Sequence, residues 1–90
     1  MKTLPDDVKP YSKTPVFNAG TTPVALQKEH RTKPGVWGRI NILEGRLGCV
    51  IPSQGVSVEL TKEKPGIVEP DIAHQVQLLG PVSFFVEFYR

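Results

Sequence analysis

The chain has 90 residues, of which 39% are hydrophobic and 22% are charged, and it contains nine prolines and eight glycines. This composition is typical of one soluble globular domain and not of a disordered segment. The formal net charge is only +2, and lysine and arginine form no basic cluster, so we expect no nucleic-acid partner. No apolar run approaches the roughly 20 residues of a membrane-spanning helix, so no membrane partner is expected.

The single cysteine, Cys49, cannot form a disulfide within the chain and stands among apolar residues, where a buried and unreactive thiol is expected. The stretch 1–7 lacks the apolar core of a signal peptide, so we expect a cytoplasmic protein. A chain this short buries only roughly 60–65% of its unfolded surface. Because pairing of two copies would bury more, we expect a homodimer.

The N-terminal third is interrupted by prolines, which divide it into an arm and two expected strands. Residues 1–10 are predicted to form an N-terminal arm, and residues 11–90 a single domain. Residues 11–14 lie between two prolines, which is typical of an edge strand, and residues 16–17 are expected to dock it on the core. Residues 23–30 are predicted to form the first core strand, and a short helix between flanking prolines is the alternative.

The two longest apolar stretches are predicted to be hairpins. Residues 36–43 alternate in apolar character, Glu44-Gly45 is typical of a two-residue turn, and residues 46–51 are expected to return antiparallel. Gly80-Pro81 is expected to turn the chain ahead of residues 82–88, which alternate again. The shorter expected strands are residues 56–60 and 67–68. About eight strands at turn spacings of roughly five to ten residues predict an all-β barrel or sandwich.

Two histidines, His30 and His74, are the first candidates for a binding or metal site. Each lies where an expected strand meets a loop, which in a small barrel is the mouth where ligands enter. The alternative interpretation is structural, with one ring hydrogen-bonded in the core and the other solvated. Two imidazoles fall short of the three protein ligands typical of a catalytic zinc or iron site. The carboxylates available as a third ligand are Glu29, Glu44, Glu69, Asp71 and Glu87.

Trp37 and Arg39 form the second candidate pair, because they project from the same face of one expected strand. A guanidinium beside an indole suits an anion or a planar ligand. The alternative is that Trp37 packs under the N-terminal arm and Arg39 is exposed. Glycine-rich phosphate motifs of the G-x-G-x-x-G or G-K-[ST] type are absent from the sequence.

The run LQKEHRTKPGVWGRINILEG at residues 26–45, with VEPDIAH at 68–74 and FFVEFY at 84–89, resembles the TehB N-terminal / YeaR-like domain family. These are small cupins associated with tellurite resistance, and the resemblance covers residues 11–90. It implies a cupin-like double-stranded β-helix, that is, a jelly-roll barrel. It also implies that the ligand-binding residues line or rim the barrel pocket. Those residues are His30, Trp37, Arg39 and His74.

In longer tellurite resistance proteins this domain precedes a methyltransferase domain that uses S-adenosylmethionine. These 90 residues hold no counterpart of it, so we expect no methyl transfer by this chain. The strand at residues 36–41 also lacks the histidine pair and glutamate of the first cupin motif. The resemblance therefore does not imply tight metal binding or dioxygenase chemistry.

The function expected from these observations is that of a non-catalytic binding module in a stress response. Its ligand would be a small anion, an oxyanion such as tellurite, or a loosely held divalent metal such as zinc, nickel or iron at His30 and His74. A metal-dependent cupin enzyme with two histidines and one carboxylate is the first alternative. The second is an interaction domain that serves as a scaffold and acts as a dimer.

Overall fold

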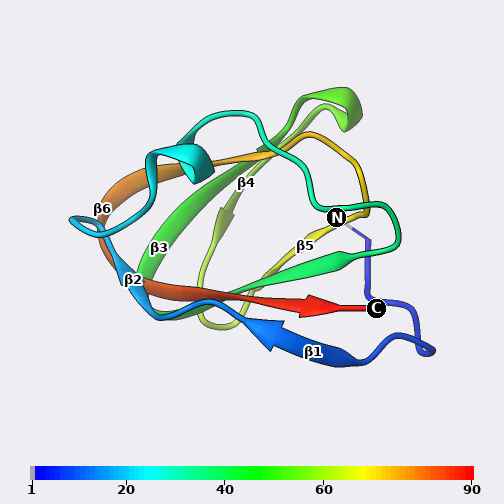
Figure 1. Cartoon of the computed structure of the whole chain (residues 1–90). Coiled ribbons are helices and arrows are strands. Elements are labelled where there is room, and N and C mark those ends of the chain that lie inside the picture. Colours follow the sequence, from blue (N-terminus) through cyan, green and yellow to red (C-terminus); the bar gives the residue numbers. More distant parts are fainter. Residues whose placement is uncertain (1) are drawn as a thin grey trace.

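A computed structural model describes residues 2–90, which form one antiparallel sheet of six strands (Figure 1). The strands are β1 (Pro10–Lys13), β2 (Phe17–Asn18), β3 (Trp37–Ile51), β4 (Val56–Leu60), β5 (Gly66–Val68) and β6 (Gln75–Tyr89). Two short 3-10 helices, η1 (Val24–Gln27) and η2 (Pro52–Gln54), lie in the connections. The all-β class expected from the sequence is confirmed. No helix in the described part of the chain is long and apolar enough to cross a membrane. Residue 1 of the expected arm lies outside the described residues.

Strands β3 and β6, each 15 residues long, are the centre of the sheet. They pair antiparallel along nearly their whole length, from Trp37 opposite Tyr89 to Val50 opposite Gln75. Strands β1 and β2 add to the other edge of β6, and β4 and β5 add to the other edge of β3. The two long strands curve together, so the sheet wraps around its own apolar face (Figure 1).

The strand pairing does not form the closed jelly-roll barrel that was expected. The order is β1-β6-β3-β4, and within residues 2–90 the end strands β1 and β4 are not paired with each other. Hydrogen bonding therefore leaves the sheet open. The bends of β3 and β6 already enclose the core, so the two edges of the sheet need not meet.

The two expected hairpin turns are wrong, because both lie inside continuous strands. Gly45 belongs to β3 and Gly80 to β6, and both have positive φ, 75° and 130°. The β3–β6 register shifts on either side of Glu44-Gly45, as β-bulges do when they bend a strand without reversing it. A Cβ on Gly45 would collide with the carbonyl oxygen of Pro81. Glycine at this position lets the two bends nest against each other.

The strand expected at residues 23–30 is also wrong, and the short-helix alternative is nearer. Val24–Gln27 forms η1, with the Leu26 amide donating to the Pro23 carbonyl at 3.1 Å. Only His30 retains a β-type pairing, as an isolated bridge to His74. Val24 is 64% exposed, whereas Leu26 packs against the core. The apolar side chains in this segment follow one helical turn and not a strand.

Other elements agree with the sequence. The edge strand expected at residues 11–14 is β1, which is exposed throughout, and those expected at 56–60 and 67–68 are β4 and β5. Of the residues expected to dock the N-terminal segment, Phe17 packs against Phe84 with ring centroids 5.7 Å apart, whereas Val16 is exposed. Cys49 is buried as predicted, and burial raises the pKa of its thiol to about 11.

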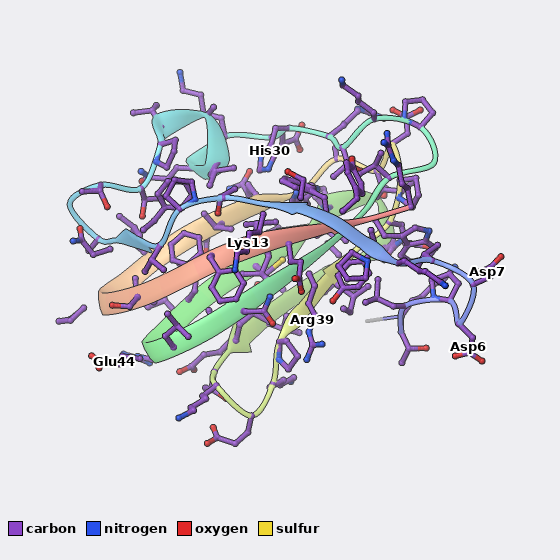
Figure 2. The ribbon with its side chains drawn as sticks, turned by 60° about the horizontal axis from the view of Figure 1, so that its bottom comes forward. Asp6, Asp7, Lys13, His30, Arg39 and Glu44 are labelled. Atoms are coloured by element: carbon purple, nitrogen blue, oxygen red, sulfur yellow. The ribbon has the colours of Figure 1, made fainter. Side chains whose placement is uncertain are left out.

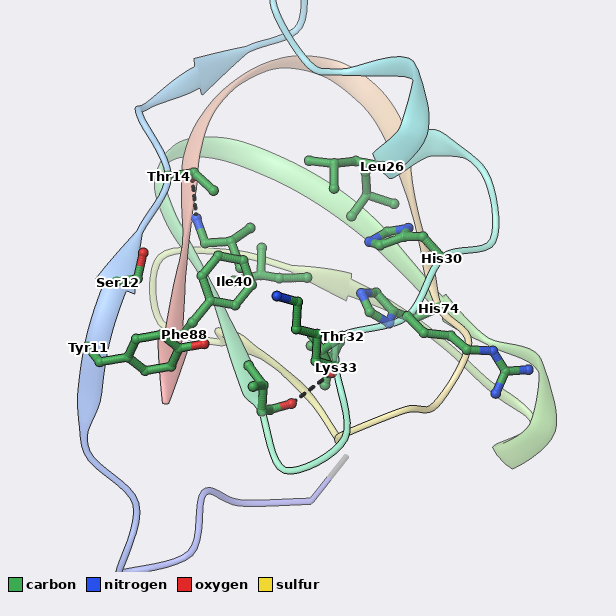
Figure 3. A pocket seen from close by; sticks show the side chains of 15 residues that line it. Tyr11, Ser12, Thr14, Leu26, His30, Thr32, Lys33, Ile40, His74 and Phe88 are labelled. Carbon is green, nitrogen blue, oxygen red and sulfur yellow. Dashed lines mark hydrogen bonds between the residues drawn. The ribbon is translucent and has the colours of Figure 1, made fainter. Parts of the chain in front are cut away.

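The core lies on the inner face of the curved sheet. Its buried members are Ile40, Ile42, Leu47, Cys49, Ile51, Leu60, Val68, Val76, Val82, Phe84 and Val86. Most of them alternate along β3 and β6, because successive side chains point to opposite faces of a strand, and Leu60 of β4 and Val68 of β5 complete the set. The segment between η1 and β3 crosses above this face and leaves a pocket beneath it (Figures 1 and 3).

Candidate functional site

A pocket of about 400 Å³ lies between the inner face of the sheet, strand β1 and the segment that leads from η1 to β3 (Figure 3). Its apolar lining residues are Leu26, Val36, Ile40, Val68, Val76, Val86 and Phe88. Its polar lining residues are Tyr11, Ser12, Thr14, His30, Arg31, Thr32, Lys33 and His74. Among the described residues, no aspartate or glutamate lines it. The polar lining therefore carries positive charge only.

His30 and His74 are held side by side in this pocket by backbone hydrogen bonds. The His30 amide donates to the His74 carbonyl at 3.0 Å, and the His74 amide donates back at 2.9 Å. Residues paired in this way place their side chains on the same face. The two rings accordingly meet edge to face, with centroids 4.1 Å apart and planes inclined at 61°.

Both imidazoles are oriented by the same local hydrogen bond. The Nδ1 atom of His30 lies 2.9 Å from the Lys28 carbonyl, and Nδ1 of His74 lies 3.0 Å from the Ile72 carbonyl. Since a carbonyl oxygen can only accept, Nδ1 carries the proton in each ring. A neutral ring then presents an unprotonated Nε2, which is a hydrogen-bond acceptor, a metal ligand or a base.

His74 is 4% exposed, and its pKa lies below the ordinary value of 6.5. Burial is the largest cause, since it disfavours the charged ring, and the neighbouring His30 adds to it. The hydrogen bond to the Ile72 carbonyl opposes this shift in part. At neutral pH His74 is therefore an uncharged ring that offers a lone pair.

Lys33 supplies the free cation of the pocket. Figure 3 shows its side chain extending into the pocket between the two imidazoles and the apolar wall of Ile40 and Phe88. Within residues 2–90 it forms no ion pair. The neighbouring residue fixes the backbone of this loop, because Thr32 Oγ1 donates a hydrogen bond to the Val36 carbonyl at 2.7 Å.

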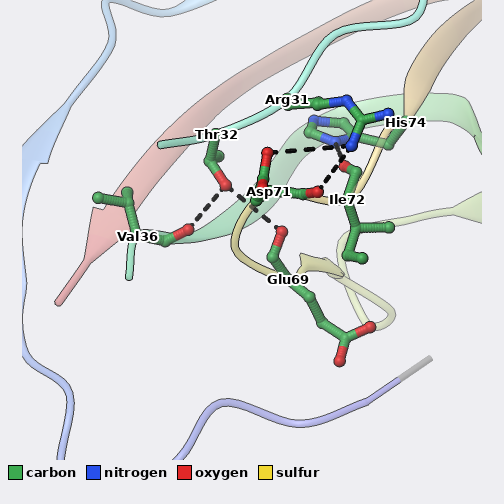
Figure 4. Close-up of polar contacts among 7 residues, drawn as sticks. All are labelled: Arg31, Thr32, Val36, Glu69, Asp71, Ile72 and His74. Atoms are coloured by element: carbon green, nitrogen blue, oxygen red, sulfur yellow. Dashed lines mark hydrogen bonds and ion pairs between the residues drawn. The ribbon is translucent and has the colours of Figure 1, made fainter. Parts of the chain in front are cut away.

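Arg31 also lines the pocket, but its guanidinium is bound to Asp71 (Figure 4). Its Nη1 donates to the Asp71 carbonyl at 3.0 Å and lies 3.9 Å from the Asp71 carboxylate. Thr32 also lies 3.4 Å from the Glu69 carbonyl. These contacts fasten the segment above the pocket to the loop that precedes β6.

Trp37 and Arg39 do not share this pocket. They alternate along β3 with Val36, Gly38 and Ile40, which face inward and are buried. In Figure 2, His30 and Arg39 lie on opposite sides of the sheet. Arg39 instead lines a separate depression with Lys2, Thr3, Leu4, Lys64, Pro65 and Ile67. Of the four residues expected to line or rim one pocket, the structure brings His30 and His74 together and places Trp37 and Arg39 outside that lining.

The metal-ligand set expected from the sequence is also incomplete. No group of three or more histidine, cysteine, aspartate or glutamate side chains that could hold a metal ion occurs in the described part of the chain. The carboxylates available as a third ligand are absent from the pocket lining. The histidine pair could contribute two nitrogen ligands at most.

The charged pocket-lining residue that sequence reasoning missed is Lys33. It lies in a basic loop, residues 31–35, three positions after His30. Its proximity to a candidate histidine was a signal, but surface loops of this composition are usually solvated. Only the crossing of this loop above the sheet brings the ammonium group into a pocket.

An open, curled antiparallel sheet with a pocket on its inner face defines a small all-β domain. Residues 12–86 match the TehB-like domain, and the chain belongs to this family. It is 31% identical over 78 residues to the "Probable S-adenosyl-L-methionine-dependent methyltransferase TehB" of Haemophilus influenzae. That match covers 78% of this chain and 26% of the relative.

Solved structures have the same fold. The crystal structure of TehB from Haemophilus influenzae superposes with a TM-score of 0.83 at 28% identity, covering 93% of this chain and 32% of that one. A crystal structure of a protein from Escherichia coli K12 superposes with a TM-score of 0.89 at 18% identity, covering 100% of this chain and 97% of that one. The chain thus spans between a quarter and a third of TehB.

Proposed function

We propose that this domain is a small-molecule binding module that holds an anion between Lys33 and the His30–His74 pair. One observation carries the proposal: an ammonium group without an ion-pair partner in residues 2–90 lies beside two imidazoles in a pocket without carboxylates. Lys33 is exposed to solvent, and a cation beside apolar side chains attracts a counter-charge into the pocket. Since the described lining residues provide none, a bound anion would supply it.

The histidines determine which anions suit the site. A neutral ring with its Nδ1 proton donated to a carbonyl presents only a lone pair, which an oxyanion without hydrogen would not favour. A protonated oxyanion resolves this, because its O–H donates to Nε2 while its charged oxygen accepts from Lys33. Each charge-assisted hydrogen bond contributes about 1.5–3 kcal/mol. Tellurite carrying one proton is such an anion, and the family resemblance to tellurite resistance domains supports it.

A loosely bound divalent metal is the second candidate, favoured by the hydrogen bonds of the two Nδ1 atoms. Metal-ligating histidines commonly donate their other ring N–H to a carbonyl, as His30 and His74 do. Zinc, nickel or iron would need further ligands from outside, since two nitrogens do not complete a site. Lys33 in the same pocket opposes a dication. We therefore rank the anion above the metal, and metal-dependent catalysis below both.

The role we assign is binding without methyl transfer. TehB of Haemophilus influenzae carries the methyltransferase name, but the match covers only 26–32% of that protein. Binding is the role that a pocket of this size on one curved sheet can fill. The cupin-like jelly-roll relationship is proposed with it, supported by two long strands that wrap around a core.

The proposed setting is the cytoplasm, without a nucleic-acid or membrane partner, and with two copies forming a homodimer. The low net charge and the single cysteine support the first part. The outer edges of β1 and β4, which end the strand order, support the second, because an unpaired edge can add a strand. Light scattering tests the dimer, and a monomer at high concentration would contradict it.

The anion site is tested by NMR titration of the imidazole signals with tellurite, phosphate and chloride. We expect saturable shifts of His30 and His74 with tellurite, and affinity about tenfold lower in Lys33→Gln. Lys62→Gln is the matched control, because Lys62 is exposed and absent from the pocket lining. Unchanged imidazole signals at about 10 mM ligand, or equal affinity of the two lysine variants, would overturn the proposal. A zinc titration by calorimetry addresses the metal.

A further inference from the structure

We infer that the preferred occupant of the pocket is an amphipathic organic acid, with a carboxylate at Lys33 and an apolar body against the wall formed by Ile40, Val86 and Phe88. This inference rests on the proposed anion-binding function and names the class of anion. It is carried by the size of the pocket, by the separation of its polar and apolar walls, and by Lys33, which forms no ion pair within residues 2–90.

The pocket is too large for a simple oxyanion. Its volume is about 400 Å³, and a water-sized group occupies roughly 30 Å³. The space therefore suits about a dozen non-hydrogen atoms, whereas an oxyanion such as tellurite has four. The remaining volume would hold water against apolar side chains. An apolar body on the same ligand would displace that water, which is favourable.

The two kinds of wall lie on different sides of Lys33 (Figure 3). His30 and His74 lie on one side of its ammonium group, and Ile40 and Phe88 lie on the other. Leu26 of η1 covers the pocket from the opposite side to the sheet. A carboxylate at Lys33 would reach the imidazoles, and an attached hydrocarbon would extend along the apolar side.

The apolar wall is rigid. Ile40, Val68 and Val76 are 2–3% exposed and belong to the central core. Ile40 of β3 lies directly opposite Val86 of β6 in the ladder. Side chains held in this way cannot collapse to fill the pocket without disturbing the sheet. A preformed apolar surface beside a charged group is the usual form of a site for a small organic ligand.

The charge of the pocket favours a monoanion. Lys33 is the free cation, because Arg31 is already bound to Asp71. A phosphate dianion is normally held by several N–H donors, an arginine fork or a helix N-terminus. An amine would be repelled by Lys33, and an alcohol would forgo the charge-assisted hydrogen bond. One carboxylate matches one ammonium group and leaves the imidazoles to bind a hydroxyl or a shared proton.

The test is an NMR titration of the whole chain with a matched series. The first ligand, 3-phenylpropionate, combines a carboxylate with an apolar phenyl group. Acetate has the carboxylate alone, 3-phenylpropanol has the apolar group without a charge, and 3-phenylpropylamine has the apolar group with a positive charge. Tellurite is the simple oxyanion of the series. We expect 3-phenylpropionate to bind about tenfold or more tightly than every other member. Lys33→Gln should weaken its binding about tenfold, and Lys62→Gln should not.

The apolar wall has its own control. Phe88→Ala should weaken 3-phenylpropionate and leave acetate unchanged, whereas Phe85→Ala, on the opposite face of β6, should leave both unchanged. Leu26→Ala, in an exposed connection, replaces Phe88→Ala if that variant does not fold. If tellurite, acetate, 3-phenylpropanol or 3-phenylpropylamine binds as tightly as 3-phenylpropionate, the organic-acid inference is wrong. The proposed anion site is then judged separately, by the titration with tellurite, phosphate and chloride. If no anion shifts the imidazole signals, both proposals fall.

Discussion

The two faces of β3 differ in chemistry, and the pocket lies on the less functional-looking of the two. The outer face presents Trp37 and Arg39, a pair whose chemistry suits an anion or a ring. The inner face presents Gly38 and Ile40, with Val36 directly before the strand, and these bring no functional group of their own. The pocket forms on the inner face, because the η1–β3 connection crosses above it there. What makes a site here is the segment that covers a strand face, and not the residues on that face alone.

The covering segment also brings its own chemistry. His30 and Lys33 belong to the connection. His74, which pairs with His30, lies directly before β6. The sheet supplies the apolar wall, and the connection supplies charge and hydrogen-bonding groups. On the outer face, Arg39 lies in a separate depression with Lys64 and with Lys2 of the N-terminal segment.

The largest expected difference between the two faces is in stability. Phe84 and Phe85 are neighbours in β6, but Phe84 is 0% exposed and packs on Phe17, whereas Phe85 is half-buried on the outer face. We expect Phe84→Ala to lower the free energy of unfolding by about 3–5 kcal/mol. Phe85→Ala should lower it by roughly 1 kcal/mol. Urea denaturation followed by circular dichroism measures both, and equal losses would contradict the distinction.

The next effect concerns the bend that separates the faces. Gly45→Ala would place a Cβ against the Pro81 carbonyl at φ 75°. We expect a loss of roughly 3 kcal/mol from the strained backbone and the collision together. Gly55→Ala, at φ 63° with open space around it, should lose only about 1 kcal/mol. Thermal or urea unfolding of the two variants checks this. A Gly45→Ala loss no larger than that of Gly55→Ala would mean that the nested bends are not closely packed.

A smaller effect follows from the pKa of the buried inner-face histidine, His74. Its folded pKa lies below 6.5, because burial disfavours the charged ring, so below that pH the unfolded chain binds more protons than the folded one. Stability should therefore be independent of this group above pH 6.5 and should fall as the pH drops below it. The slope for one proton is at most about 1.4 kcal/mol per pH unit.

Urea denaturation between pH 8 and 5 measures this effect (the range spans the ordinary pKa of 6.5 and one to two units either side). The matched variant, His74→Gln, should remove the slope below pH 6.5. An identical slope in the variant would assign the acid sensitivity to other groups. Glu69, whose pKa is lowered chiefly by its hydrogen bond to Lys2, acts in a separate window, with stability lost only below pH 4.5.

The smallest expected effect is that of the outer-face pair on ligand binding. Trp37 and Arg39 do not line the pocket, so Trp37→Phe and Arg39→Ala should leave anion affinity within about twofold of the parent. Lys33→Gln provides the contrasting variant in the same titration. An outer-face variant that weakens binding as much as Lys33→Gln would move the site to the other side of the sheet.

The sequence predicted well what depends on alternation. The all-β class, the alternation of residues 36–43 and 82–88, and the edge strand β1 all follow from a period of two and from the placement of prolines. It predicted poorly what depends on pairing partners. Glu44-Gly45 has the composition of a turn, but continuous pairing of β3 with β6 makes it a bend.

By itself, the sequence determined the strand faces, the sites where the backbone can take positive φ, and the residue types able to bind an anion. These are properties of single residues and of their neighbours in the chain. The tertiary structure alone decided that His30 meets His74, that Lys33 enters a pocket, and that Trp37 and Arg39 lie outside it. The His30–His74 pair alone joins residues 44 positions apart (74 − 30 = 44). These contacts arise only when two long strands curve together and a connection crosses above them.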